Sequence, residues 1–278
     1  GAEFVLDCVS SGGGGVEGYR RSYVEGMESI LIWARRQPVG TLVYTSSTSV
    51  YPQGSPAQAS PESNPLGYAT PEPEATIVVD EAAPTEGAGE TACVLLEAEA
   101  LLRAGRDGRL TRPGKTEDPG LNIPSLGTTE KDDPAVRPYH RSSILRLAGI
   151  YGPDRHRLLD QVRAGEVSGR AQDHINLIHR DDICSAIWAA LTAPAGRKDE
   201  IFNVADDAAA TRGEVTDWLA ARLGVPPPRF TDAAAAGRRT MTPDRIIANT
   251  RLKHALGWRP AFPSFREGYA AVLRPQIP

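Results

Sequence analysis

Cysteine is scarce in this sequence, with three residues in 278. Cys8, Cys93 and Cys184 are an odd number, lie far apart and include no Cys-x-x-Cys pair. This usage argues against a disulfide framework and favours a reducing compartment. We therefore expect a cytoplasmic protein.

Long apolar runs and basic stretches are also absent. No run reaches the ~18–20 apolar residues of a membrane span, and no secretory signal opens the sequence. Lysine and arginine are dispersed and offset by acids, with a net charge of −4. The five histidines show no metal-ligand spacing. We expect no membrane, no nucleic-acid partner and no metal site, and the sequence gives no indication of oligomeric state.

Short apolar runs alternate with amphipathic segments along the chain. Residues 3–9 and 41–45 resemble buried strands, and apolar residues recur at three- and four-residue spacing between them. Two strands joined in this way form a parallel βαβ unit. Further strands are expected at 142–147, 175–178 and 201–204, with helices at 89–104, 157–163, 183–191, 212–223, 250–256 and 265–273. The pattern predicts an α/β fold, a Rossmann-like parallel sheet with helices on both faces and a small C-terminal α/β lobe.

Two segments interrupt this pattern. Residues 52–75 and 105–141 are rich in proline, glycine and small or charged residues, with few large apolar ones. Both exceed the ~12–15 residues at which structureless loops become uncommon in compact domains. We interpret them as insertions in a first domain, residues 1–150, which is followed by a substrate-binding lobe, residues 151–278.

Two motifs mark the ends of predicted strands. Residues 42–51 read Leu-Val-Tyr-Thr-Ser-Ser-Thr-Ser-Val-Tyr, and residues 144–153 read Ile-Leu-Arg-Leu-Ala-Gly-Ile-Tyr-Gly-Pro. Together they resemble the extended short-chain dehydrogenase/reductase family, the NAD-dependent epimerases and dehydratases. The resemblance implies NAD or NADP as cofactor and a small-molecule substrate, a sugar nucleotide or a similar polar metabolite. It extends over most of residues 1–51, 76–104 and 142–274.

The resemblance also implies the site residues. A hydroxyl at the position of Ser47 binds the reacting oxygen of the substrate in this family. Cofactor-binding residues would be Ser10, Ser11, Gly12, Gly13, Thr45, Ser46, Ala148, Gly149, Ile150 and Tyr151. Arg155 and His179 would bind the substrate. The glycine run after Ser11 is not interpreted as a G-x-G-x-x-G phosphate cradle, because no strand feeds it in the required register and no acid lies at the right distance.

Each of these assignments has a purely structural alternative. The serine cluster is also typical of a local turn that caps a strand. Asp181 or Asp182 would cap the helix that follows His179. The glycines after Ser11 also suit a flexible connector, and Arg155 an ordinary surface position.

The family's catalytic Tyr-x-x-x-Lys pair is missing. In the matching helix, Glu99 stands at the family's glutamate, so Thr91 and Leu95 occupy the tyrosine and lysine positions. A threonine hydroxyl is too weak an acid to replace the tyrosine. The family's first strands and phosphate loop are also missing, which corresponds to ~60–75 residues at roughly 30 residues per βαβ unit. We therefore expect an N-terminally shortened member of an atypical subgroup that lacks the catalytic pair.

Two functions remain open at this point, besides the possibility that this chain, without the family's phosphate loop, binds no dinucleotide because NAD or NADP needs the missing N-terminal units. One is an NAD(P)-dependent epimerase/dehydratase-like oxidoreductase, weakly active or inactive in this form. The other is a non-catalytic NAD(P) or metabolite sensor that keeps the pocket without the proton chemistry. The serine cluster favours the enzyme, and Thr91 with Leu95 favours the sensor.

Overall fold

The computed structural model describes residues 1–52, 76–86, 88–105, 138–194, 200–231 and 244–274. The first expected insertion, residues 52–75, lies outside these ranges apart from Pro52. Most of the second, residues 106–137, lies outside them as well.

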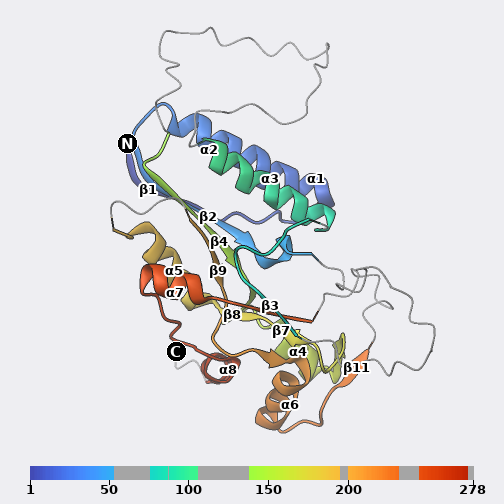
Figure 1. Ribbon diagram of the computed structural model, residues 1–278. Helices are drawn as coiled ribbons and strands as arrows, with labels where there is room; N and C mark the ends of the chain where they lie inside the picture. The colour runs from blue at the N-terminus through green and yellow to red at the C-terminus, as the bar shows by residue number, and fades with distance from the viewer. Residues whose placement is uncertain (53–75, 87, 106–137, 195–199, 232–243, 275–278) are drawn as a thin grey trace, which may run out of the picture.

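A four-stranded parallel sheet lies at the centre of the fold (Figure 1). Its strands, in spatial order, are β1 (Ala2–Asp7), β2 (Val39–Ser47), β4 (Arg141–Leu147) and β9 (Glu200–Val204). All three neighbouring pairs are parallel. The prediction of a parallel Rossmann-like sheet is confirmed, and every strand ends at the same edge.

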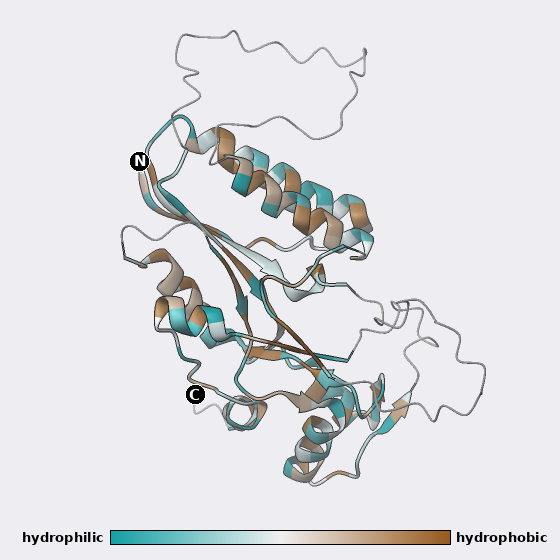
Figure 2. Cartoon of the chain, viewed as in Figure 1, coloured by the Kyte–Doolittle hydropathy of each residue, from teal (hydrophilic) through white to brown (hydrophobic). Residues whose placement is uncertain are grey.

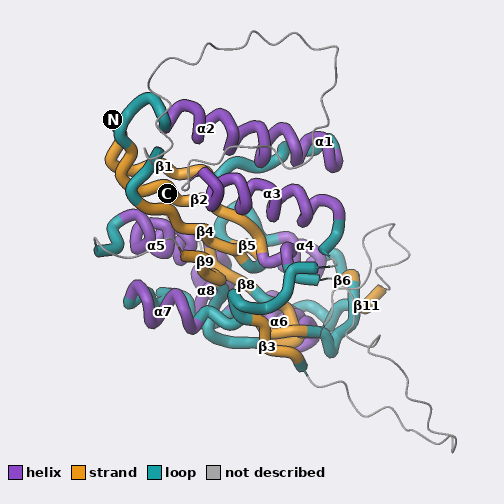
Figure 3. Tube along the Cα trace, turned by 45° about the horizontal axis from the view of Figure 1, so that its top comes forward, coloured by secondary structure: helices purple, strands orange, loops and turns teal. Residues whose placement is uncertain are grey.

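Helices cover both faces of this sheet, as predicted (Figures 1 and 3). On one face lie α1 (Gly15–Tyr19), the π-helical turn η1 (Arg20–Glu25), α2 (Gly26–Ala34) and α3 (Glu90–Gly105). On the other face lie α5 (Arg180–Leu191) and α7 (Thr250–Leu256). These helices mix apolar and polar stretches, as helices with one buried side do (Figure 2).

The remaining elements form a smaller lobe with its own apolar core. They are β5 (Gly149–Tyr151), α4 (Arg157–Arg163), β6 (Glu166–Ser168), β7 (His174–Ile175), β8 (Leu177–His179), β10 (Ala210–Thr211), α6 (Arg212–Leu223), β11 (Arg229–Thr231) and α8 (Phe265–Val272). The expected division after residue 150 is not a clean break in the chain. β9 returns to the central sheet, and α5 and α7 pack on it, because the apolar sides of these segments complete the larger core.

Two short strands, β3 (Ile77–Val79) and β12 (Arg245–Ile247), pair in parallel. One local expectation needed correction. The second insertion ends earlier than expected, since Tyr139 is buried and its hydroxyl donates to the carbonyl of Leu102. A single tyrosine was a weak signal within a polar segment.

The outer edge of the sheet carries exposed apolar side chains. Among the described strands, β1 pairs only with β2. Phe4 and Leu6 of β1 and Val9 just after it are exposed, as is Trp188 of α5. The ring of Phe4 meets that of Trp188 edge-on, with centroids 6.3 Å apart. None of the described helices is long and apolar enough to cross a membrane.

Candidate functional site

The parallel pairing brings three predicted site segments to one edge of the sheet. β1 leads into Cys8–Ser11, β2 ends at Thr45–Ser47, and β4 leads into Ala148–Tyr151. The hydroxyl of Thr45 donates to the backbone carbonyl of Asp7, 3.3 Å away, and so joins the ends of β2 and β1. Open α/β sheets place their ligand crevice outside this edge.

Ser47 is the last residue of β2 and is half-buried. Its backbone is extended, and its hydroxyl oxygen accepts the backbone N–H of Ser49 at 3.1 Å. This is the local turn bond of the structural alternative, and it caps the short helix Thr48–Val50. The bond uses the oxygen only as an acceptor, so the Ser47 O–H keeps its capacity to donate to a ligand.

Ser46 points into a buried polar network instead. Its hydroxyl donates to the carboxylate of Glu99 at 2.7 Å, and Glu99 pairs with Arg146 of β4 through two bonds of 3.1 and 2.7 Å. Arg146 also donates to the hydroxyl of Tyr51 at 3.2 Å, which donates to the Asn203 side chain at 2.7 Å. The network fixes the end of β2 against β4 and β9. Ser46 is only 6% exposed, so its side chain serves this network.

The positions of the missing catalytic pair are now located on α3. Leu95 is 3% exposed and belongs to the apolar core, while Thr91 is half-buried in the first turn of the helix. A lysine at residue 95 would therefore bury its charge. Local packing around α3 has adapted to an apolar side chain at that position.

The glycine-rich segment after β1 exposes its backbone. Gly12 and Gly13 have positive φ, 62° and 113°, and a Cβ at either position would meet nothing within 4 Å. Ser10 is exposed and Ser11 half-buried. A Cβ on Gly18 would lie 1.9 Å from the carbonyl oxygen of Gly13, so glycine is required there. The segment thus leaves room for close approach of a ligand to the main chain.

The sequence does contain the spacing Gly13-x-Gly15-x-x-Gly18, and the structure places it at the start of a helix. Residues 8–12 separate it from the end of β1, whereas the fingerprint normally follows its strand directly. β2 ends in Thr45–Ser47 with no acid for a ribose. The separation of this run from β1 therefore supports the interpretation that it is not a standard phosphate cradle.

The segment after β4 is held mainly by its backbone. Ala148 N–H donates to Val204 at 3.0 Å, and Gly149 N–H donates to Asn176 at 2.9 Å. Ala148 is buried, while Gly149 is exposed and Ile150 half-buried, so Gly149 and Ile150 present the accessible surface here.

Tyr151 turns into the smaller lobe. It is 2% exposed, and its ring stacks on that of Tyr269 with centroids 4.6 Å apart. Burial and the nearby carboxylates of Asp206 and Asp182 raise the pKa of Tyr151, so its phenol stays protonated. A direct contact between its side chain and a cofactor stays a prediction.

His179 and Arg155 differ in accessibility. His179 is 1% exposed, and its Nδ1 accepts the backbone N–H of Asp181 at 3.2 Å, which makes His179 the N-cap of α5. The expectation that Asp181 or Asp182 caps the helix is therefore wrong. Asp182 instead accepts the backbone N–H of Ala261 at 2.6 Å. Arg155 is exposed, and substrate binding by either residue stays a prediction.

Asp206, just past the end of β9, was not singled out from the sequence. Its carboxyl is 8% exposed, and its Oδ2 has no hydrogen-bond partner among the described residues. Burial and the nearby carboxylates of Asp207 and Asp182 raise the pKa of Asp206 to about 8. A hydrogen bond from Ala208 N–H opposes this shift. It also lines a cavity of about 290 Å³ together with residues 175–176, 205–209, 246–250 and Lys253. No pattern in the sequence distinguishes this aspartate from a surface one.

Solved structures share this arrangement of elements. The complex of MoeE5 with UDP-glucuronic acid and NAD aligns with a TM-score of 0.66 and 17% identity, covering 97% of this chain and 77% of that one. UDP-glucuronic acid 4-epimerase of Bacillus cereus, solved with NAD, aligns at 0.65 and 15% over 98% and 74%. An NAD-dependent epimerase/dehydratase of Methylobacillus flagellatus aligns at 0.59 and 25% over 98% and 75%. The chain has the epimerase/dehydratase fold.

Sequence relatives of this epimerase/dehydratase-fold chain match only part of it. Protein YeeZ of Escherichia coli K12 is 32% identical over 120 residues, 43% of this chain and 40% of that protein. The 3-diazoavenalumate denitrifying reductase of a Streptomyces species is 34% identical over 140 residues, 45% of each. The chain thus spans less than half the length of these curated relatives. No protein-family model matches it.

Proposed function

We propose that this chain is the nicotinamide-side part of an NAD(P)-dependent epimerase/dehydratase-like oxidoreductase that acts on a sugar nucleotide or a similar polar metabolite. The observation that carries the proposal is the meeting of the Ser10–Gly13, Thr45–Ser47 and Gly149–Ile150 segments at one edge of a parallel sheet. Structures with the same fold contain NAD, which supports the same cofactor here.

The residues at this edge suit a nicotinamide ribose. Gly12 and Gly13 leave their main chain uncovered, and Gly149 is exposed as well. Such backbone groups can approach a flat ring and its sugar closely. Ser47 can donate a hydrogen bond to a reacting oxygen. When bound, the cofactor would supply hydride chemistry that no side chain here can perform.

A sensor without turnover is the second candidate. Thr91 and Leu95 favour it, because neither can move a proton in the way that a tyrosine–lysine pair does. The core position of Leu95 also favours the sensor, because a lysine side chain at that position would have to bury its charge.

Fluorescence titration with NADH and NADPH tests cofactor binding. The Ser11→Glu variant places a negative charge beside the exposed glycines and should weaken binding of either anionic dinucleotide about tenfold. Ala100→Glu, at an exposed position near the other end of α3, is the matched control and should leave affinity unchanged. Equal effects of the two variants, or absence of binding both by the unaltered chain and by a version with the family's first two βα units added before Gly1, would contradict the proposal.

Turnover separates the enzyme from the sensor. The chain is incubated with NAD and UDP-glucuronic acid or UDP-glucose, and formation of reduced nicotinamide and of altered sugar is followed. Product formation favours the oxidoreductase. Dinucleotide binding without any product favours the sensor.

A further inference from the structure

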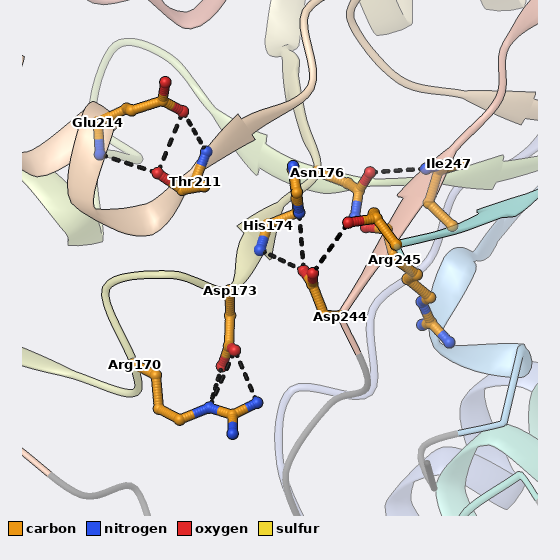
Figure 4. Close-up of polar contacts among 10 residues, drawn as sticks. Arg170, Asp173, His174, Asn176, Thr211, Glu214, Asp244, Arg245 and Ile247 are labelled. Carbon is orange, nitrogen blue, oxygen red and sulfur yellow. Dashed lines mark hydrogen bonds and ion pairs between the residues drawn. The ribbon is translucent and has the colours of Figure 1, made fainter. Parts of the chain in front are cut away.

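A histidine and an aspartate from distant segments meet beside the smaller lobe (Figure 4). His174 begins β7 and Asp244 immediately precedes β12, so 70 residues separate them in sequence. Thr76, immediately before β3, completes the group. The pairing of β12 with β3 brings Asp244 and Thr76 together.

Asp244 is held in a fixed orientation. Its Oδ1 accepts the backbone N–H of His174 at 2.6 Å and faces the ring Nδ1 of His174 at 2.8 Å. Its Oδ2 accepts the hydroxyl of Thr76 at 3.3 Å. Asn176 holds the register beside them, since its amide donates to Arg245 O at 2.9 Å and accepts Ile247 N–H at 2.7 Å. The carboxylate therefore cannot turn away from the ring without losing three bonds.

This geometry sets the tautomer of the imidazole. Partial burial alone would raise the pKa of Asp244, but the hydrogen bonds from the backbone and ring of His174 outweigh it and the pKa is lowered. An ionised carboxylate only accepts hydrogen bonds, so Nδ1 carries the proton. In the neutral ring, Nε2 is then left with a lone pair, as in histidines oriented by a carboxylate for acid–base work.

The pair remains open to solvent. The side chains of His174 and Asp244 are 20% and 26% exposed, and the hydrogen bonds of His174 to described residues use its backbone N–H and its ring Nδ1. Glu214 of α6 also interacts with His174 electrostatically, but it is engaged by Thr211 in the capping box of its own helix. Asp244 thus remains the direct acidic partner of the ring.

The pair is also linked to the proposed site through neighbouring residues. Arg245 follows Asp244 directly, is 6% exposed, and donates to the carbonyls of Pro52 at 2.7 Å and Thr48 at 3.1 Å. Those carbonyls belong to the chain just after Ser47. Asn176, two residues past His174, accepts the backbone N–H of Gly149. Two of the three segments of the sheet edge are therefore joined to the histidine–aspartate pair.

We propose that His174 and Asp244 form an acid–base dyad whose Nε2 contacts a hydroxyl of a polyhydroxylated substrate. The inference rests on the proposed function for its redox partner, oxidised nicotinamide. As the carbinol carbon passes its hydride to that ring, the O–H bond breaks, its electron pair forms the new C=O bond, and the proton goes to Nε2. The dyad supplies the proton acceptor that Thr91 and Leu95 do not.

The test follows the imidazole nitrogens of the full chain by NMR with ¹⁵N-labelled histidine. UDP-glucuronic acid and UDP-glucose are the probes, and His174→Gln assigns the His174 signals. His156 is the matched control, because its Nδ1 also faces a carboxylate, Asp160 at 3.1 Å, but on the surface of α4. We expect the Nε2 signal of His174 to shift to saturation with at least one probe while that of His156 stays in place.

Asp244→Asn keeps a hydrogen-bond acceptor but removes the charge, so it should weaken binding of that probe about tenfold, as should His174→Gln. Unchanged His156 signals in both variants would report an intact fold. A His174 signal unmoved by either probe, or equal affinity in wild type and both variants, overturns the dyad. NADH titrations run in parallel test the proposed function separately. Sugar-nucleotide binding through His174 without NADH binding would support the dyad and contradict the proposed cofactor.

Discussion

The carboxylate of Glu99 and the guanidinium of Arg146 form a buried two-bond ion pair between α3 and β4. The Nη2–Oε2 distance is 2.7 Å, and the side chains are 5% and 4% exposed for Arg146 and Glu99. The same carboxylate accepts Ser46, one residue before Ser47. The pair therefore links the interior of the fold to the edge at which the candidate site lies.

Replacement of Glu99 by glutamine should destabilise the protein strongly. It would leave the buried Arg146 charge without its partner, a loss of about 3–5 kcal/mol in the free energy of unfolding. Glu97→Gln is the control on the same helix, because the Glu97–Arg20 pair is 28% and 41% exposed and should contribute less than about 1 kcal/mol. Urea denaturation measures both, and similar losses in the two variants would contradict the expected difference.

Asp206 should make stability fall with rising pH. Its native pKa is raised to about 8 from 3.8, so the folded state holds a proton that the unfolded state releases. The stabilisation is complete below the unfolded value and is lost as pH rises through the folded value. Between these limits, Asp206→Asn should reduce the slope of unfolding free energy against pH by up to ~1.4 kcal/mol per unit.

The comparison for this prediction is Asp217→Asn, an exposed position on α6. That variant should follow the wild-type curve across the whole range. A pH profile for Asp206→Asn that also follows the wild type would show that the buried carboxyl is already ionised near neutrality.

Gly268 should not tolerate alanine. A Cβ there would lie 1.9 Å from the hydroxyl oxygen of Tyr151, whose ring is fixed by stacking on Tyr269. Overpacking of this kind costs about 1–3 kcal/mol. Gly26→Ala in the helix of the other domain has open space and helical φ of −60°, and should gain about 0.5–1 kcal/mol. Thermal unfolding would reveal the opposite signs, and a loss at both positions would argue against the packing of α8.

Alanine substitutions at Ser46 and Ser47 should differ in their effects on stability and on ligand binding. Ser46→Ala removes a bond to a buried carboxylate and should cost about 1–3 kcal/mol of stability. Ser47→Ala removes a bond within a half-buried turn and should cost less, but should weaken sugar-nucleotide binding with NADH affinity unchanged. Calorimetric titration beside urea denaturation measures both effects. The assignment of Ser47 would not survive if the alanine variant bound the ligand like the wild type.

The sheet and most helices could be predicted because each is encoded locally. Apolar runs identified β2 and β4, and helical periodicity identified α4, α6 and α7 with their observed bounds. The placement of Glu99 came from the resemblance, but its partner did not, since nothing near Arg146 in the sequence signals an ion pair 47 residues away.

The same limit explains what was missed at the candidate site. The His174–Asp244 pair depends on β12 lying beside the segment around Asn176, and strands as short as β7 and β12 carry little periodic signal. Propensity predicts an aspartate as the N-cap of α5. Asp182 instead accepts the backbone N–H groups of Ala261 and Phe262 in a distant segment. In both cases, tertiary contacts outweighed the local propensity of the sequence.

The outer edge of β1 has a consequence for handling the protein. Its main-chain donors and acceptors on that side meet no described strand, and the ring of Trp188 on α5 contacts the exposed Phe4 of β1. An extended peptide with alternating apolar and polar residues could pair with β1 through main-chain hydrogen bonds and bury its apolar side chains there. Concentrated samples should accordingly be watched for sheet-to-sheet joining, and a lysine introduced in place of Leu6 would offer a simple way to keep molecules apart.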